Sequence, residues 1–254
     1  MKIGAQLYTV RDFMGSIEDF DATLEKIAAM GYKGVQFSPW KEFGAQQIRE
    51  VADKHGLKIV VSHYPPKKLV ENPQEAMEAH KILGMNKIGI GSMPNEYREN
   101  KEAVLKFIED FKPAVDELSK NGFKFMYHNH EFEFEKFDGK LMIEYLLDAF
   151  PPEQMGIILD LFWVQAGGAD PAEWLRKLKG RVETVHFKDY AIINKQRKFS
   201  EVLEGNMNWT SIVAACHEVG VEWALVEQDD CNGKDPFDCL QTSITNLKEA
   251  GLIG

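Results

Sequence analysis

Short apolar segments alternate with helix-like segments eight times along the chain, and this alternation restricts the fold more than any other feature. The predicted strands cover residues 2–9, 34–38, 57–63, 86–91, 124–131, 156–161, 182–188 and 223–227. Helical spacing of apolar residues predicts helices over 16–30, 45–55, 73–83, 100–120, 141–150, 212–219 and 235–250, with another beginning near residue 170. Several of these helices are followed at once by glycine, which commonly ends a helix.

Eight strand–helix units in 254 residues match a TIM barrel in number and size. The structural alternative is a doubly wound open sheet, which usually carries a glycine-rich phosphate motif after its first strand. The turn after the first strand reads Tyr8-Thr-Val-Arg-Asp-Phe-Met-Gly15 and contains no such motif. We therefore predict an α/β fold with one (β/α)8 TIM-barrel domain over residues 1–254. Pro113 is expected to kink or split the helix over 100–120.

Charge and cysteine content narrow the function classes. The formal net charge is −10 and the pI is near 5.3, which argues against nucleic acid as a partner, because phosphate binding requires clustered Lys and Arg. Three cysteines without a CxxC pair indicate free thiols in a reducing compartment. The sequence shows neither a signal-peptide pattern nor a long apolar span, so we expect a cytoplasmic protein without a membrane partner.

Four consecutive predicted strands end in side chains of the kinds that bind metals or move protons. In chain order these ends carry His128 and His130, then Asp160, then His186 and Lys188, then Glu227 and Asp229. Side chains at positions i and i+2 share one face of a strand, so the polar groups of each strand project together. The carboxyl ends of the strands form the active-site face of TIM barrels. We therefore predict that these groups converge on one ion.

Each of these side chains also has a purely structural interpretation. A single buried histidine is more often part of a hydrogen-bond network than a ligand, Asp160 is placed to cap the next turn, and Glu227 could pair with Lys188. Their shared location at one end of a barrel favours the metal site. Three further histidines fall on predicted helices and are expected to be surface or capping residues: His55, His80 and His217.

Further residues around the barrel mouth are candidate substrate contacts. Gln6, Tyr8, Gln36 and His63 end the first three strands, and Trp40 and Trp163 lie just past strand ends. The faces of the two tryptophans suit the C–H faces of sugars, although packing also explains a large aromatic residue at a barrel rim. The loops show no recognisable phosphate cradle.

Five motifs occur in a fixed order along nearly the whole chain. They are Gln6-Leu-Tyr-Thr-Val-Arg-Asp12, Tyr127-His-Asn-His-Glu-Phe-Glu-Phe134, Leu159-Asp160 with Trp163, His186-Phe-Lys-Asp189, and Val226-Glu-Gln-Asp229. Together they resemble the xylose isomerase-like TIM-barrel superfamily and, within it, the sugar phosphate isomerase/epimerase family. The resemblance implies one divalent ion held by Glu, Asp, His and Glu from strands five to eight. Carried over by position, these ligands become His128, Asp160, His186 and Glu227, with His128 departing from the usual glutamate.

The departure at position 128 bears on the expected reaction. In epimerases of this family, two metal-bound glutamates face opposite sides of a substrate carbon and exchange its proton. With His128 in place of one glutamate, epimerisation loses a base, whereas isomerisation or elimination needs a base on one face only. Relatives with histidine in this region include inosose dehydratase-like enzymes. A metal-dependent lyase or dehydratase of keto-inositols or keto-sugars is therefore the principal alternative.

The expected chemistry is proton abstraction next to a carbonyl through a metal-stabilised enediolate. Mn²⁺, Zn²⁺ or Co²⁺ suits the mixed imidazole and carboxylate ligands better than Mg²⁺. Glu227 is the expected base, His130 a second acid or base, and Lys188 the group that stabilises negative charge. Asp229 is expected to contact the substrate, a small keto-sugar or polyol-derived ketone. A homo-oligomer is compatible with the sequence.

Two other function classes stay open. A nuclease of the endonuclease IV type shares this barrel, but it requires more metal ligands and a basic groove, against which the acidic charge argues. A non-catalytic sugar-binding protein would keep the same site without exchanging carbon-bound protons. We expect a metal-dependent enzyme of the sugar isomerase or epimerase kind.

Overall fold

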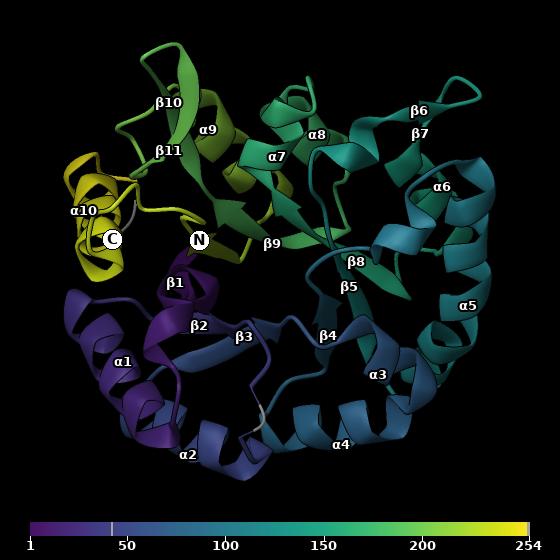
Figure 1. Cartoon of the computed structure of the whole chain (residues 1–254), viewed down its shortest axis with the longest axis horizontal. Helices are drawn as coiled ribbons and strands as arrows, with labels where there is room; N and C mark the ends of the chain where they lie inside the picture. Colours follow the sequence, from purple (N-terminus) through teal and green to yellow (C-terminus); the bar gives the residue numbers. More distant parts are fainter. Residues whose placement is uncertain (42, 253–254) are drawn as a thin grey trace.

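Eight parallel β-strands form the centre of the molecule in the computed structural model, which describes residues 1–41 and 43–252 (Figure 1). They are β1 (Lys2–Gln6), β2 (Gly34–Phe37), β3 (Lys58–Ser62), β4 (Lys87–Ile90), β5 (Lys124–His128), β8 (Met155–Asp160), β9 (Val182–Phe187) and β12 (Trp223–Val226). Around the sheet their order is β3-β2-β1-β12-β9-β8-β5-β4, so strands that are consecutive in the sequence are neighbours in space.

The sheet closes where its two end strands meet. His63, just after β3, makes a parallel bridge to Gly89 of β4, and the Tyr64 N–H donates to the Gly89 carbonyl at 2.7 Å. A Cβ on Gly89 would lie 2.5 Å from the Ser62 carbonyl oxygen, so glycine permits this close approach. The eight strands thus form a nearly closed barrel, and the predicted TIM barrel is confirmed.

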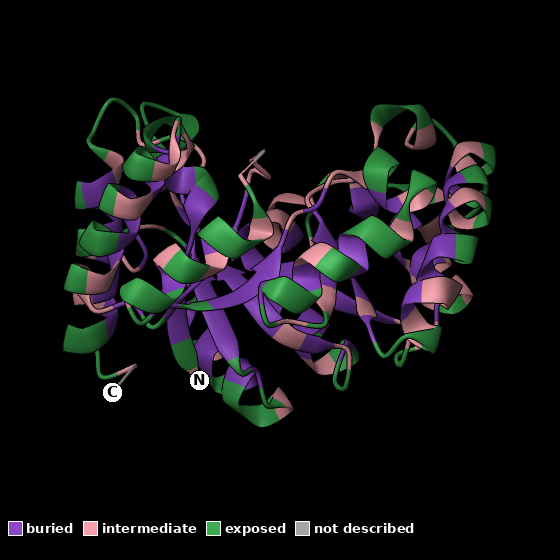
Figure 2. Cartoon of the chain, turned by 90° about the horizontal axis from the view of Figure 1, so that it is seen from below, coloured by how far each residue is buried: buried purple, intermediate pink, exposed green. Residues whose placement is uncertain are grey.

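Helices surround the barrel, and their outward faces are exposed while the strands are buried (Figures 1 and 2). The α-helices are α1 (Ile17–Met30), α2 (Ala45–Lys54), α3 (Pro66–Glu71), α4 (Pro73–Ile82), α5 (Lys101–Lys120), α6 (Met142–Ala149), α7 (Leu161–Ala166), α8 (Pro171–Lys177), α9 (Trp209–Val219) and α10 (Pro236–Glu249). Helix α1 begins with a capping box between Ser16 and Asp19 and ends at Gly31, whose φ is 100°. In the described part of the chain, no helix has the length and apolar character needed to cross a bilayer.

Alternation along the strands separates two apolar regions. Met126, Ile158 and Leu225 pack together inside the barrel, whereas their neighbours in the chain pack outward in the larger core under the helices. Two residues further on, the inward face of these three strands carries His128, Asp160 and Glu227, listed here in chain order. The strand parity predicted from the sequence therefore continues to the barrel mouth.

The first strand is shorter than predicted. It ends at Gln6, and the 3-10 helix η1 (Leu7–Phe13) follows, so Tyr8 lies on this helix rather than in a strand. The Gln6 side chain accepts the Tyr8 N–H at 2.9 Å, which caps η1 and stops the strand. Two further 3-10 turns, η2 (Asn95–Tyr97) and η3 (Phe132–Phe134), lie in the loops.

The structure contains two β-hairpins that the sequence pattern does not predict. They are β6 (Lys136–Phe137) with β7 (Lys140–Leu141), and β10 (Asp189–Ile193) with β11 (Gln196–Ser200). The first turns at Asp138-Gly139, a typical hairpin dipeptide, and both residues have positive φ. The second turns at Asn194-Lys195, also with positive φ, although lysine is uncommon there. The loop predicted between residue 188 and Asn208 is therefore largely a hairpin.

Helix α5 continues through Pro113 without being split, because apolar residues on both sides of the proline are buried and hold the helix against the barrel. One expectation about the helical histidines is wrong. His80 is fully buried rather than at the surface. Its Nδ1 donates to the Ala76 carbonyl at 2.6 Å and its Nε2 lies 2.6 Å from the Ser62 hydroxyl. Helices α3 and α7 are additional to the predicted set.

Asp189 organises the chain that follows the seventh barrel strand. Its buried carboxylate accepts five hydrogen bonds, four from backbone N–H groups and one from an indole: Tyr190, Leu203, Gly205, Met207 and Trp209. A Cβ on Gly205 would lie 2.2 Å from an Asp189 oxygen, so only glycine allows this approach. Asp189 therefore anchors the hairpin and the following loop beside Lys188.

Replacing Asp189 with alanine should lower the free energy of unfolding by about 3 kcal/mol or more, because five donors, two of them fully buried, lose their acceptor. The matched control Asp148→Ala removes an exposed carboxylate and should change it by less than about 0.5 kcal/mol. Urea denaturation of both variants measures the difference. Equal losses would show that Asp189 is not the anchor of this segment.

Candidate metal centre

The four strand ends converge. His128, Asp160, His186 and Glu227 are all buried, and one ligand atom of each lies within 4.8 Å of the others. The Asp160 Oδ2 lies 3.5 Å from His128 Nε2 and 3.5 Å from His186 Nδ1, and the Glu227 Oε2 lies 3.0 Å from His186 Nδ1. The structure thus brings together the four residues that the family resemblance implied.

Strand register and one asparagine place these side chains. Asp160 of β8 pairs with His186 of β9, so both reach the same level of the barrel. Asn129, directly after β5, accepts the Asp160 N–H at 2.9 Å and donates to the Asp160 carbonyl at 3.3 Å. The Asp160 Oδ1 accepts the Trp163 N–H at 3.0 Å and caps α7, which leaves Oδ2 facing the imidazoles.

Supporting hydrogen bonds fix which nitrogen of each imidazole faces the centre. The His128 Nδ1 lies 2.9 Å from the Gly91 carbonyl, which can only accept, so this nitrogen carries the proton and Nε2 keeps its lone pair. The His186 Nε2 donates to the Gln36 Oε1 at 2.7 Å, which leaves the Nδ1 lone pair facing inward. Metal-binding histidines are commonly oriented in this way by a second hydrogen bond.

The carboxylate of Glu227 is arranged similarly. Its Oε1 accepts from the Gln6 amide at 3.0 Å, and its Oε2 faces His186. Two lone pairs that face each other at 3.0 Å require a proton or a metal ion between them. The four inward atoms are buried and make no well-aligned hydrogen bond: His128 Nε2, Asp160 Oδ2, His186 Nδ1 and Glu227 Oε2. The two oxygens instead form ion pairs with the Lys188 ammonium at 2.9 and 2.8 Å.

The arrangement of these atoms fits a metal ion. Tetrahedral coordination with bonds of about 2.0–2.1 Å places ligand atoms about 3.3 Å apart. Three of the six separations here are 3.0–3.5 Å, and all six lie within 4.8 Å. Asp160, Glu227 and Asp229 all lie close to the ammonium of Lys188. Three carboxylates and one ammonium leave two negative charges, which a divalent cation would neutralise.

Burial disfavours every charge at this site, but the charges stabilise one another. Against the effect of burial, Lys188 and the two imidazoles hold the pKa of Asp160 well below its usual range. Lys188 and His186 likewise lower the pKa of Glu227. The same carboxylates raise the pKa values of Lys188 and His186 despite burial. The carboxylates are therefore ionised and available as ligands.

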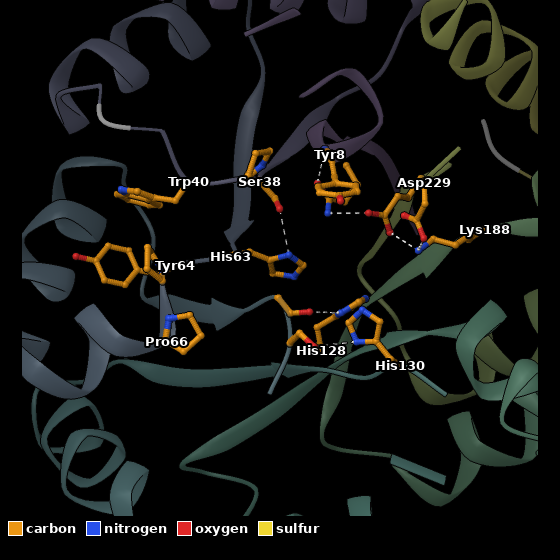
Figure 3. Close-up of a pocket in the computed structure, with 16 residues that line it drawn as sticks. Tyr8, Ser38, Trp40, His63, Tyr64, Pro66, His128, His130, Lys188 and Asp229 are labelled. Carbon is orange, nitrogen blue, oxygen red and sulfur yellow. Dashed lines mark hydrogen bonds and ion pairs between the residues drawn. The ribbon is translucent and has the colours of Figure 1, made fainter. Parts of the chain in front are cut away.

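A pocket of about 600 Å³ opens above these residues (Figure 3). Of the substrate contacts predicted from the sequence, five line it: Gln6, Tyr8, Trp40, His63 and Asp229. Gln36 is fully buried and supports His186 instead. The Trp163 ring lies beside the pocket, with its centroid 5.5 Å from the His130 ring and 5.4 Å from the Lys188 ammonium.

His130 lines the pocket next to His128, with the two rings 4.8 Å apart and nearly perpendicular. Burial and the charges of His128 and Lys188 lower the pKa of His130 to about 2, so its imidazole is neutral. The backbone N–H of His130 donates to the Glu133 Oε2 at 2.7 Å, and the Tyr127 hydroxyl donates to the Glu133 Oε1 at 2.7 Å.

Glu133 and Asn129 are not among the site residues predicted from the sequence. Glu133 is fully buried, and burial raises its pKa to about 7 despite the hydrogen bonds from Tyr127 and His130. The sequence does contain a clue to Glu133: a carboxylate between two phenylalanines, three residues after His130, is expected to be buried and to accept hydrogen bonds from the turn. Together these two side chains hold the loop that carries His130.

Comparison of the chain with models of known protein families identifies its family. A family model described as xylose isomerase-like TIM barrel matches residues 24–250, and the chain belongs to this family. No curated protein matches the chain by sequence.

Solved structures share the fold. A sugar phosphate isomerase/epimerase from Parabacteroides distasonis is 24% identical, with a TM-score of 0.83 over 100% of this chain and 95% of that one. A probable 3-DHS dehydratase from Bacillus anthracis is 14% identical, with a TM-score of 0.75 over 98% and 99% of the two chains. A D-allulose 3-epimerase from Methylomonas sp. is 13% identical, with a TM-score of 0.71 over 98% and 97%.

The raised pKa of Glu133 predicts a pH-dependent stability. The folded state holds this carboxyl neutral up to about pH 7, whereas the ordinary value is 4.5, so folding stability is lost as the pH rises between these values. Relative to Glu133→Gln, the wild type should lose on the order of 3 kcal/mol from pH 4 to pH 8. Urea denaturation of both proteins at several pH values gives this difference.

The control for this measurement is Glu153→Gln, at an exposed position. Its stability should run parallel to that of the wild type over the same pH range. A constant difference between the wild type and Glu133→Gln would mean that folding does not shift the pKa of Glu133, which would contradict the prediction.

Proposed function

We propose that the protein is a divalent-metal-dependent enzyme that moves a proton on the carbon next to the carbonyl of a keto-sugar or polyol-derived ketone. One observation carries the proposal: buried ligand atoms from four strand ends face one point at the floor of a pocket. His128, Asp160, His186 and Glu227 would hold the ion, and the whole of residues 1–254 would act as one barrel domain. Imidazole nitrogens among the ligands favour Mn²⁺, Zn²⁺ or Co²⁺.

When bound, the ion would act as a Lewis acid toward a carbonyl oxygen and its neighbouring hydroxyl. The chain supplies the proton transfers. Glu227 lines the pocket as an ionised carboxylate and is the base that removes the proton from carbon. His130, as a neutral imidazole on the pocket wall, passes a proton to or from a substrate oxygen. Lys188 and Asp229 line the same wall and bind substrate oxygens.

The pocket favours a neutral sugar over a sugar phosphate. Among its described lining residues, Lys188 is the only lysine or arginine, and three carboxylates already surround its ammonium. A phosphate dianion would meet Glu227 and Asp229 and find no lysine or arginine besides Lys188, whose charge these carboxylates already balance. On the opposite wall, Trp40 and Tyr64 offer aromatic surface to the C–H groups of a sugar ring.

Elimination is the second candidate reaction. The ligand from β5 is His128, so Glu227 is the one glutamate among the four ligand residues, and a base on one face suffices for elimination or isomerisation. The proton that Glu227 removes from carbon would leave with the departing hydroxyl as water, and the neutral His130 imidazole would hydrogen-bond that hydroxyl. The solved structures with this fold include both an epimerase and a probable dehydratase, so both outcomes have precedent on this barrel.

Proton NMR in D₂O with added Mn²⁺ tests the proposal. Keto-sugars, keto-inositols and sugar phosphates are incubated with the protein, and a substrate should exchange a carbon-bound proton or lose water. Glu227→Gln should slow this about 10²–10⁴-fold, as expected for the loss of a general base. His186→Ala should lose the bound metal, as measured by elemental analysis.

Glu183→Gln is the matched control, because this glutamate lies on the same strand as His186 but near Lys87 and Lys124 at the amino ends of the strands. It should keep activity and metal. Full activity in Glu227→Gln and His186→Ala would contradict the proposed centre, and sugar binding without exchange would identify a non-catalytic sugar-binding protein instead.

A further inference from the structure

Lys188 lies against the same atoms that would bind the metal. Its ammonium is 2.9 Å from the Asp160 Oδ2 and 2.8 Å from the Glu227 Oε2, and the residue is 1% exposed. These two oxygens are also the ones that face the imidazoles of the candidate centre. A single pair of oxygens therefore serves two possible cations, the ammonium of Lys188 and a divalent ion.

The two cations cannot use these oxygens equally well at the same time. An ammonium within about 4 Å of a divalent ion meets a repulsion of several kcal/mol, even at the effective dielectric constant of about 20 found in proteins. A carboxylate oxygen shared between the two cations is also a weaker partner for each of them. Binding of the ion thus favours movement of the ammonium away from Asp160 and Glu227.

The structure holds a second partner for the ammonium. The Asp229 Oδ2 lies 3.1 Å from the Lys188 Nζ, on the side of the pocket (Figure 3). This side chain is 23% exposed, whereas the other two carboxylates are almost completely buried. The rings of Trp163 and Phe199 lie 5.4 and 5.9 Å from the ammonium and flank its position. A small movement between neighbouring carboxylates is therefore available.

We propose that Lys188 is the internal counter-ion of the metal centre. Without a divalent ion it neutralises the ligand carboxylates of Asp160 and Glu227 and holds them in place, and on metal binding it yields them and pairs with Asp229. Lys188 thereby preorganises the ligands, weakens metal affinity by competing for them, and turns toward the pocket once the ion is bound. The inference rests on the proposed metal centre and extends it to a positioning residue.

Metal binding without substrate tests this directly. Co²⁺ titrations followed by visible absorption and calorimetry compare the wild type with Lys188→Met, which keeps the length of the side chain and removes the charge. The variant should bind Co²⁺ on the order of tenfold more tightly, because a competing cation is gone. Its metal-free form should melt at a lower temperature than the wild type, and Co²⁺ should reverse this loss.

Asp229→Asn tests the second half of the proposal and serves if Lys188→Met fails to fold. It removes the carboxylate that receives the ammonium, so Co²⁺ affinity should fall about tenfold. In the double variant Lys188→Met/Asp229→Asn, the substitution at Asp229 should have little further effect. If Asp229 acted only through its own charge, Asp229→Asn would lower Co²⁺ affinity equally in the wild type and in Lys188→Met. That result would show that the proposed movement of Lys188 is wrong.

Lys87→Met is the matched control, because Lys87 is a partly buried lysine that pairs with Glu183 away from the candidate centre. Its Co²⁺ affinity should equal that of the wild type. Weaker or unchanged binding by Lys188→Met would overturn the counter-ion proposal while leaving the metal centre intact. Failure of the wild type itself to bind Co²⁺ or Mn²⁺ would overturn the metal centre on which the proposal rests.

Discussion

At the barrel mouth, four side chains each use one polar atom for a supporting hydrogen bond and turn the other toward a common point. Gly91, Gln36 and Gln6 support three of them, and the start of α7 supports Asp160. Burying these oxygen and nitrogen lone pairs close together costs free energy unless a cation lies among them. The centre is therefore stable only with a bound ion, a proton or the ammonium of Lys188, and its chemistry follows from which cation is present.

The barrel makes this concentration of charge possible. Its interior is filled by apolar side chains such as Met126, Ile158 and Leu225, which carry no polar group that could compete for the ligands. Parallel strands present all their carboxyl ends at one face, so four separate segments deliver polar groups to the same level. Asp189, with its five hydrogen bonds, then anchors the hairpin and loop that follow Lys188.

Much of this was predictable from the sequence. Strand parity is a local property, so the inward placement of His128, Asp160, His186 and Glu227 could be inferred from alternation within each strand. Short-range turn chemistry was less clear: the 3-10 helix after Gln6 and the hairpin at Asn194-Lys195 carry weak signals. The burial of His80 could not be predicted, because helical spacing does not reveal that the Ser62 hydroxyl on β3 forms a hydrogen bond with its imidazole.

The sequence by itself determined the alternation of strands and helices, the barrel that follows from it, and the set of residues at the strand ends, because each depends on periodicity over a few residues. Only the tertiary structure decided how those residues are used. The contact between His186 and Gln36 joins positions 150 residues apart and sets which nitrogen faces the centre. The position of Lys188 among three carboxylates likewise arises only when β8, β9 and β12 lie side by side. Such contacts depend on barrel closure and register, which no local pattern encodes.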